Sequence, residues 1–163
     1  MGRHAWRRWA VVATAATVLL AGCADRGPAA PQGSVELDFT EVGTAIESNP
    51  DGQWAVATAD EAEVQRLLRD PDLRAGLSAD DVTVRGGQVA VLVRADYRLD
   101  TSEVVRVVET DRGWLVQMRG HEKSECTLPA VVEADVRVLL VEADSPPAEV
   151  QQEVHVLPGC GRD

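Results

Sequence analysis

The fold is decided by one stretch of the sequence, which reads Val105-Arg106-Val107-Val108-Glu109-Thr110-Asp111-Arg112-Gly113-Trp114-Leu115-Val116-Gln117-Met118. Apolar side chains recur at alternate positions near both ends of this stretch, and Asp111-Arg112-Gly113 between them is typical of a turn. A period of two with a glycine-containing turn indicates two strands that fold back on each other. The stretch therefore predicts a β-hairpin.

Further strands are predicted on both sides of this hairpin. A second hairpin is indicated over 82–93, where alternating valines flank Gly86-Gly87. The same alternation, with the Asn49–Gly52 turn signal, predicts single strands at 35–39, 54–57, 136–140 and 154–156. Valine is abundant while the chain has one Phe and one Tyr, so the core is expected to be aliphatic and β-branched, as sheets favour.

One helix is predicted between residues 58 and 69. Thr58 and Glu61 have the spacing of a capping box, and Val64, Leu67 and Leu68 recur at helical spacing behind them. Asp70-Pro71 ends the run, and a second short helical turn around 73–77 is compatible with the pattern. We therefore expect one α+β domain over 35–163, with a mainly antiparallel sheet of about seven strands and one capped helix.

The first 22 residues have the pattern of a secretion signal. Arg3, Arg7 and Arg8 form a basic region without acids, and an apolar run follows from Ala10 to Ala21. That run is too short to span a bilayer as a permanent helix. A short buried helix is the alternative. Arg7-Arg8 could also belong to a twin-arginine signal, but Trp6 precedes the pair where such signals favour a polar residue, so general secretion is preferred.

The end of this segment, Leu20-Ala21-Gly22-Cys23, resembles the lipobox of bacterial lipoproteins. The resemblance implies that the Cys23 thiol receives a diacylglycerol and that Cys23 becomes the first residue of the mature protein. It also implies a lipid anchor in the outer face of the cytoplasmic membrane. Residues 23–34, rich in Ala, Pro and Gly, are then expected to form a flexible tether with a reach of about 30 Å.

Charge limits the classes of partner. The whole chain has a formal net charge of −11, and removal of the three signal arginines lowers it to −14. Such a domain repels phosphate backbones, which argues against nucleic acid as a partner. Lys123 is the one lysine, and this preference for arginine, with abundant Ala, Val and Gly, is typical of a GC-rich genome and suggests an actinobacterium.

Two cysteines remain if Cys23 carries lipid. Outside the cytoplasm, Cys126 and Cys160 are expected to form a disulfide that pins the C-terminal tail. The loop it would close corresponds to a stabilisation of about 3–4 kcal/mol. The alternative, a thiol metal site, lacks both a CxxC spacing and a histidine at ligand spacing.

Candidates for catalysis are few. The sequence contains no GxSxG elbow, HExxH, P-loop or dinucleotide-binding glycine pattern. His155 falls on the polar face of a predicted strand and is expected at the surface. His121 lies in a charged stretch with Glu122 and Ser124, which could be catalytic or simply solvated. We therefore predict no catalytic residue, no cofactor and no metal site.

Two acidic clusters and two tryptophans leave alternatives open. Asp70-Pro71-Asp72 and Asp80-Asp81 could chelate calcium, but they lack the ligand positions of an EF-hand and can equally be solvated acids at helix ends. Trp54 and Trp114 each begin a predicted strand beside a turn, so each is either a core anchor or part of a pocket rim. The core is favoured because the domain has little other aromatic mass to bury.

The order of elements over 58–156 resembles the PrcB-like family of protease-complex-associated lipoprotein domains, which begin with a strand and a short capped helix and continue as hairpins. The resemblance implies association with a protease complex. That family carries a Thr-Gly-Gly-Tyr-type stretch where this chain reads Asp100-Thr101-Ser102-Glu103, and no site residue is carried over. The sequence thus favours a non-enzymatic envelope lipoprotein that binds a protein or small ligand. The alternatives are an envelope hydrolase using His121 and a lipid carrier.

Overall fold

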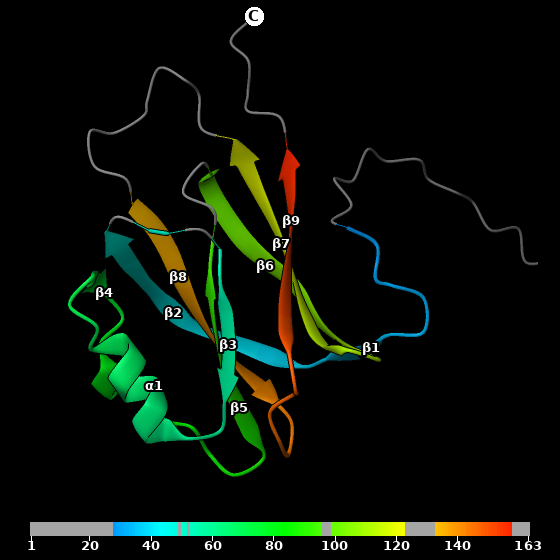
Figure 1. The fold of residues 1–163 in the computed structure, drawn as a ribbon, viewed down its shortest axis with the longest axis horizontal. Coiled ribbons are helices and arrows are strands. Elements are labelled where there is room, and N and C mark those ends of the chain that lie inside the picture. Colours follow the sequence, from blue (N-terminus) through cyan, green and yellow to red (C-terminus); the bar gives the residue numbers. More distant parts are fainter. Residues whose placement is uncertain (1–27, 49, 52, 96–98, 123–132, 158–163) are drawn as a thin grey trace, which may run out of the picture.

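The computed structural model describes residues 28–48, 50–51, 53–95, 99–122 and 133–157. Within these ranges the strands form two sheets (Figure 1). Sheet A has the order β1-β6-β7-β9, and sheet B has the order β3-β5-β8-β2-β4. Sheet A contains β1 (Val35–Leu37), β6 (Leu99–Thr110), β7 (Gly113–Glu122) and β9 (Val150–Leu157). Sheet B contains β2 (Phe39–Ser48), β3 (Ala55–Thr58), β4 (Leu73–Gly76), β5 (Gln88–Arg94) and β8 (Glu133–Glu142).

The molecule has three layers, in which helix α1 (Glu61–Leu68) covers sheet B and sheet B packs on sheet A (Figure 1). Strand β5 shows this arrangement, because its side chains alternate between two cores. Val89, Val91 and Val93 join the inter-sheet core, which also contains Trp114, Met118 and Leu139. Ala90 and Leu92 join the helix-side core with Val64 and Leu68 of α1. Strand β5 is therefore buried on both faces.

The sheets are antiparallel apart from one parallel pair, β7 with β9. Within the described ranges, the expected α+β class with mainly antiparallel strands and one α-helix is confirmed. The expectation of a single sheet of about seven strands is wrong, because the strands divide between two sheets. The division begins at Asp38, where the predicted 35–39 strand breaks and the chain passes from β1 in sheet A to β2 in sheet B.

The predicted hairpin at 105–118 is confirmed. Strands β6 and β7 pair in antiparallel register from Leu99 with Glu122 to Thr110 with Gly113. Gly113 has φ 134°, and a Cβ there would lie 2.2 Å from the carbonyl oxygen of Glu149, so the turn requires glycine. The strands predicted at 54–57, 136–140 and 154–156 are also present, as parts of β3, β8 and β9.

Two local predictions are wrong. No strand forms at 82–84, because β5 pairs with β3 and β8 and leaves the preceding segment as a loop. Residues 73–76 form strand β4 instead of a helical turn. This strand pairs with β2. Gly76 has φ 108°, and a Cβ at this position would lie 2.2 Å from the backbone oxygen of Thr44, so the close pairing requires glycine here.

Helix α1 is present, but its N-cap differs from the predicted Thr58–Glu61 capping box. The cap is Asp60, whose side chain accepts a hydrogen bond from the Ala62 N–H at 2.9 Å. The Thr58 hydroxyl donates to Glu63 at 2.8 Å, and Glu61 accepts from the Val84 N–H at 3.1 Å. Glu61 therefore attaches the helix to the loop before β5. A capping box does occur in the short 3-10 helix η1 (Ala79–Asp81), between Ser78 and Asp81.

Candidate functional site: a cavity beside Trp54

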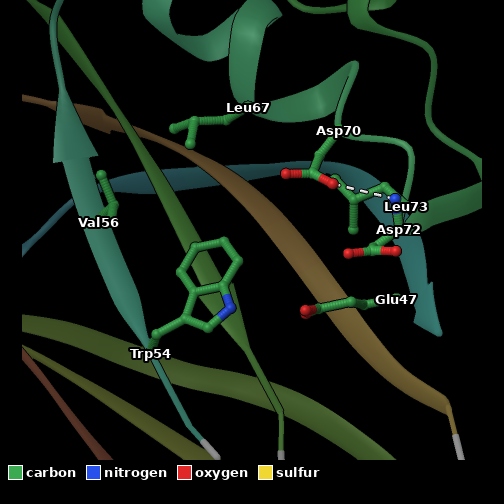
Figure 2. Close-up of a pocket in the computed structure, with 7 residues that line it drawn as sticks. All are labelled: Glu47, Trp54, Val56, Leu67, Asp70, Asp72 and Leu73. Atoms are coloured by element: carbon green, nitrogen blue, oxygen red, sulfur yellow. Dashed lines mark hydrogen bonds between the residues drawn. The ribbon is translucent and has the colours of Figure 1, made fainter. Parts of the chain in front are cut away.

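A cavity of about 250 Å³ opens on the helix side of sheet B, next to the C-terminal end of α1 (Figure 2). Its lining combines an indole ring and three aliphatic side chains with three carboxylates. The residues come from β2, β3 and the residue before it, α1, β4, and the turn between α1 and β4: Glu47, Trp54, Val56, Leu67, Asp70, Asp72 and Leu73. Segments distant in the sequence thus build one concave surface.

Trp54 forms the aromatic wall of the cavity. Its side chain is half-buried and packs against the helix-side core. Its carbonyl oxygen accepts a hydrogen bond from the Arg94 N–H at 2.9 Å, which ties residue 54 to the end of β5. The Arg94 guanidinium carbon lies 5.8 Å from the centroid of the Trp54 ring, within the range of a cation–π contact. These contacts hold the indole in place.

The buried Arg94 also positions the carboxylate of Glu47. The Arg94 side chain is only 3% exposed, and its Nη1 donates to Glu47 Oε1 at 2.6 Å. Its Nη2 donates to the carbonyl oxygen of Asp51. Such a charge-assisted pair is short and directional. Figure 2 shows the Glu47 carboxylate directed toward the Trp54 ring. Glu47 Oε2 is buried and has no hydrogen-bond partner in the described part of the chain.

The acidic rim is fixed by a turn that follows α1. The Asp70 side chain accepts a hydrogen bond from the Asp72 N–H at 3.0 Å. The Asp70 backbone oxygen accepts another from the Leu73 N–H, also at 3.0 Å. The Asp72 backbone oxygen accepts from the Ser48 N–H at 2.9 Å, which attaches the turn to β2. The carboxylates of Asp70 and Asp72 therefore line a preformed edge of the cavity.

This arrangement favours a cation with an apolar part. Arg94 balances the charge of Glu47, which leaves Asp70 and Asp72 as a net negative rim. An indole face attracts cations, and the aliphatic lining offers an apolar contact. The lining contains carboxylates but no His, Cys, Ser or Lys side chain. The residues present therefore supply contacts that can bind a cation.

The two tryptophans predicted as core anchors have different environments. Trp114 is 4% exposed and belongs to the inter-sheet core, as expected. Trp54 packs against a core and lines the cavity, so the pocket alternative applies to it. Neither His121 nor His155 lines this cavity. His155 is exposed on β9, as predicted, and His121 is exposed near the end of β7.

The acidic clusters have structural partners. Asp80 forms an ion pair with Arg69 at 3.2 Å, and Asp81 accepts from the Ser78 N–H at 3.1 Å in the capping box. Asp70 and Asp72 belong to the cavity rim. Among the described residues, no group of three or more His, Cys, Asp or Glu side chains is arranged to hold a metal ion.

Cys23, Cys126 and Cys160 lie outside the described residues, so lipidation of the first and pairing of the other two stay predictions. In the part of the chain that is described, no helix has the length and apolar character needed to cross a membrane.

Sequence reasoning singled out Trp54, Asp70 and Asp72 separately but missed Glu47 and Arg94. An arginine directly after the apolar run Val89–Val93 was the available signal, because a cation at the end of a buried strand needs a partner.

No family model matches the chain, and neither the curated proteins nor the solved structures contain a match.

Proposed function

We propose that this protein is a lipid-anchored binding protein of the cell envelope, with no enzymatic activity, and that its cavity beside Trp54 binds a small organic cation. The observation that carries the proposal is the combination of an aromatic wall with a net negative rim in a preformed cavity. The anchor is supported by the basic and apolar segment that ends in Leu20-Ala21-Gly22-Cys23.

The size of the cavity restricts the ligand. A volume of about 250 Å³ lies just below the range for small-molecule sites, which begins at roughly 300 Å³. It suits a compact amine or guanidinium compound, or one basic side chain of a partner protein. A cation–π contact contributes about 0.5–2 kcal/mol, so we expect weak to moderate affinity. A lipid carrier would need a larger and wholly apolar cavity.

The alternative is an envelope hydrolase that uses His121. It has less support because His121 is exposed on β7 of sheet A and lines no part of the cavity. Association with a protease complex rests on the order of elements alone. Neither idea explains why a buried Arg94 and Glu47 should hold an indole against a net negative rim.

The proposal can be tested with three probes of one shape: 2-phenylethylamine, 2-phenylethanol and phenylacetate. We expect the amine to shift the indole N–H signal of Trp54 in a ¹H–¹⁵N spectrum, the alcohol to shift it less and the acid to leave it unchanged. The amine should bind more weakly at high salt, because the rim is solvent-exposed and its charges are screened.

Two variants and a control locate the binding. Trp54→Leu and Asp72→Asn should each weaken amine binding severalfold, since one removes the aromatic wall and the other a rim charge. Binding to both variants is followed by the backbone N–H signal of Leu73, which also lines the cavity, because Trp54→Leu removes the indole signal. The Asp72→Asn change keeps the backbone bond to Ser48. Asp80→Asn, an exposed aspartate outside the lining, should have no effect. Equal binding of all three probes, or an amine response that survives both cavity variants, would refute cation recognition at this site.

A further inference from the structure

The outer face of sheet A carries a buried polar residue where a solvated one is expected. On β7, Trp114, Val116 and Met118 point into the inter-sheet core, so Gln117 points to the opposite face. Gln117 is nevertheless only 1% exposed, and Val108, which faces the same way on β6, is 0% exposed. The chain therefore covers this face of the sheet.

The N-terminal segment 28–34, which lies on the side of sheet A away from α1 (Figure 1), contacts this face through Ala29. Gln117 Nε2 donates to the Ala29 carbonyl oxygen at 3.2 Å and to Glu153 Oε2 of β9 at 2.7 Å. A turn follows, in which the Ser34 N–H and hydroxyl both donate to the Pro31 oxygen, at 3.2 and 2.7 Å. Val35 then pairs with Glu109 in sheet A. The segment is thus attached to the sheet at both of its ends.

These attachments shorten the free chain between the proposed anchor and the domain. Five residues, 24–28, separate Cys23 from Ala29. Fully extended at about 3.3–3.6 Å per residue, the connection from Cys23 to Ala29 spans roughly 20 Å. As a flexible chain its average span is nearer to about 13 Å. The outer face of sheet A is therefore kept close to the surface in which Cys23 would be anchored.

The cavity beside Trp54 lies on the other side of the molecule. Segment 28–34 contacts the outer face of sheet A, whereas the cavity opens on the face of sheet B that is turned away from sheet A. Stacked sheets are about 10 Å apart, and the helix layer adds a similar distance. The short connection to Cys23 on one side of the domain and the cavity on the other side together determine which side of the domain faces the lipid surface.

We propose that segment 28–34 is a docked strap that turns the outer face of sheet A toward the lipid surface and presents the Trp54 cavity to the aqueous side. The inference rests on the proposed anchor at Cys23. The partner of the strapped face is the bilayer that holds the anchor, and the cavity receives ligands from the opposite direction.

The orientation can be measured on the mature lipidated protein in phosphatidylcholine vesicles that contain a headgroup-labelled acceptor lipid. A genetically encoded fluorescent amino acid is placed at Gln151, exposed on β9 beside the strapped face, or at Arg66, exposed on α1. We expect severalfold more energy transfer from position 151 than from position 66. Equal transfer from both positions, or more from 66, would overturn the orientation.

The strap is tested with Gln117→Ala and a matched glutamine control, Gln88→Ala. Gln88 donates to Glu142 at 2.8 Å on an exposed surface away from the strap. Gln117→Ala should bring the two transfer efficiencies toward equality, because the released segment lengthens the free chain, while Gln88→Ala should leave their ratio unchanged. A folded Gln117→Ala protein with the native ratio would show that this contact does not set the direction. If Gln117→Ala does not fold, the energy transfer from positions 151 and 66 in the native chain still tests the orientation.

An unlipidated chain that begins at residue 23 with Cys23→Ser, and so lacks the apolar signal segment, separates this inference from the proposed anchor. It should not associate with the vesicles, whereas the native lipidated chain should. Failure of the native chain to associate would overturn the anchor and the orientation together, while association with equal transfer at both positions would overturn the orientation alone.

Discussion

The two faces of sheet B are covered in different ways. One face packs on sheet A and forms a core in which Trp114 is 4% exposed and Met118 and Leu139 are 0% exposed. The other face is covered by α1 and by loops, and here Trp54 stays half-exposed beside a cavity. Two tryptophans that look alike in the sequence thus have different roles because different layers cover them.

The shortness of helix α1 relative to the strands explains why the two faces of sheet B are covered differently. An eight-residue helix is about 12 Å long, whereas a ten-residue strand such as β2 or β8 extends over about 33 Å. Helix α1 cannot cover the sheet by itself, so the chain after it returns through Asp70–Leu73 and through Val82 to cover more of the face. The cavity occupies a part that neither covers. A short helix on a wide sheet is therefore one way to leave a binding site.

The largest expected effect comes from exchanging the two tryptophans for alanine one at a time. Trp114→Ala should lower the free energy of unfolding by about 3–5 kcal/mol, since it empties a closed core. Trp54→Ala should cost about 1–2 kcal/mol, because its ring already contacts the open cavity. Urea denaturation of both variants measures the difference. Equal losses would mean that the helix-side face is as tightly packed as the inter-sheet core.

The buried ion pair should give the next effect. Arg94→Met should destabilise the domain by about 3–5 kcal/mol, because it leaves the mostly buried Glu47 carboxylate without its partner. Arg69→Met, which breaks an exposed pair with Asp80, should cost at most about 1 kcal/mol.

A double variant separates the charge of Glu47 from the packing of Arg94. Adding Glu47→Leu to Arg94→Met should recover part of the lost stability, since the orphaned charge is removed. If the double variant is no more stable than Arg94→Met, then Arg94 acts by packing against Trp54 and by its bond to Asp51, not by neutralising Glu47.

The smallest effect is expected at His121, which belongs to neither face of sheet B. His121→Ala should change the free energy of unfolding by less than about 0.5 kcal/mol, as exposed substitutions usually do. It should also fully complement a strain that lacks the gene. A variant that folds normally but fails to complement would place function at the end of β7 and favour the hydrolase over the binding protein.

The elements that could be predicted from the sequence are those whose spacing of apolar residues is visible within one short segment. The hairpin of β6 and β7 and the strands β8 and β9 follow alternating apolar side chains, and α1 follows helical spacing. The three-residue alternation at 82–84 gave a wrong strand, because Val82 is instead a loop residue buried in the helix-side core. A pattern of that length does not distinguish a strand from a loop that inserts side chains into a core.

The second sheet and the cavity depend on contacts between distant segments. Val89–Val93 is an unbroken apolar run, which is typical of a strand buried on both faces, but only its alternating valines entered the prediction, and the second layer was missed. Nothing local indicated that β2 continues to Ser48 or that Glu47 meets Arg94, since those positions become neighbours only when β2, β8 and β5 pair. The acids Asp70 and Asp72 were visible as a cluster, but their place beside Trp54 was not.

The place of β8 in sheet B has a consequence for how the protein acquires its fold. Strand β8 lies between β5 and β2, and it joins Phe39 to Val141 at one end and Ser48 to Glu133 at the other. Until residues 133–142 have been synthesised, sheet B can exist only as the two separate ribbons β3-β5 and β2-β4, and two-stranded ribbons are marginally stable in water. Pairings between such distant segments make folding slow. The β2-β4 ribbon and the valine-rich β3-β5 ribbon therefore stay open to aggregation until a late strand of the chain arrives to join them.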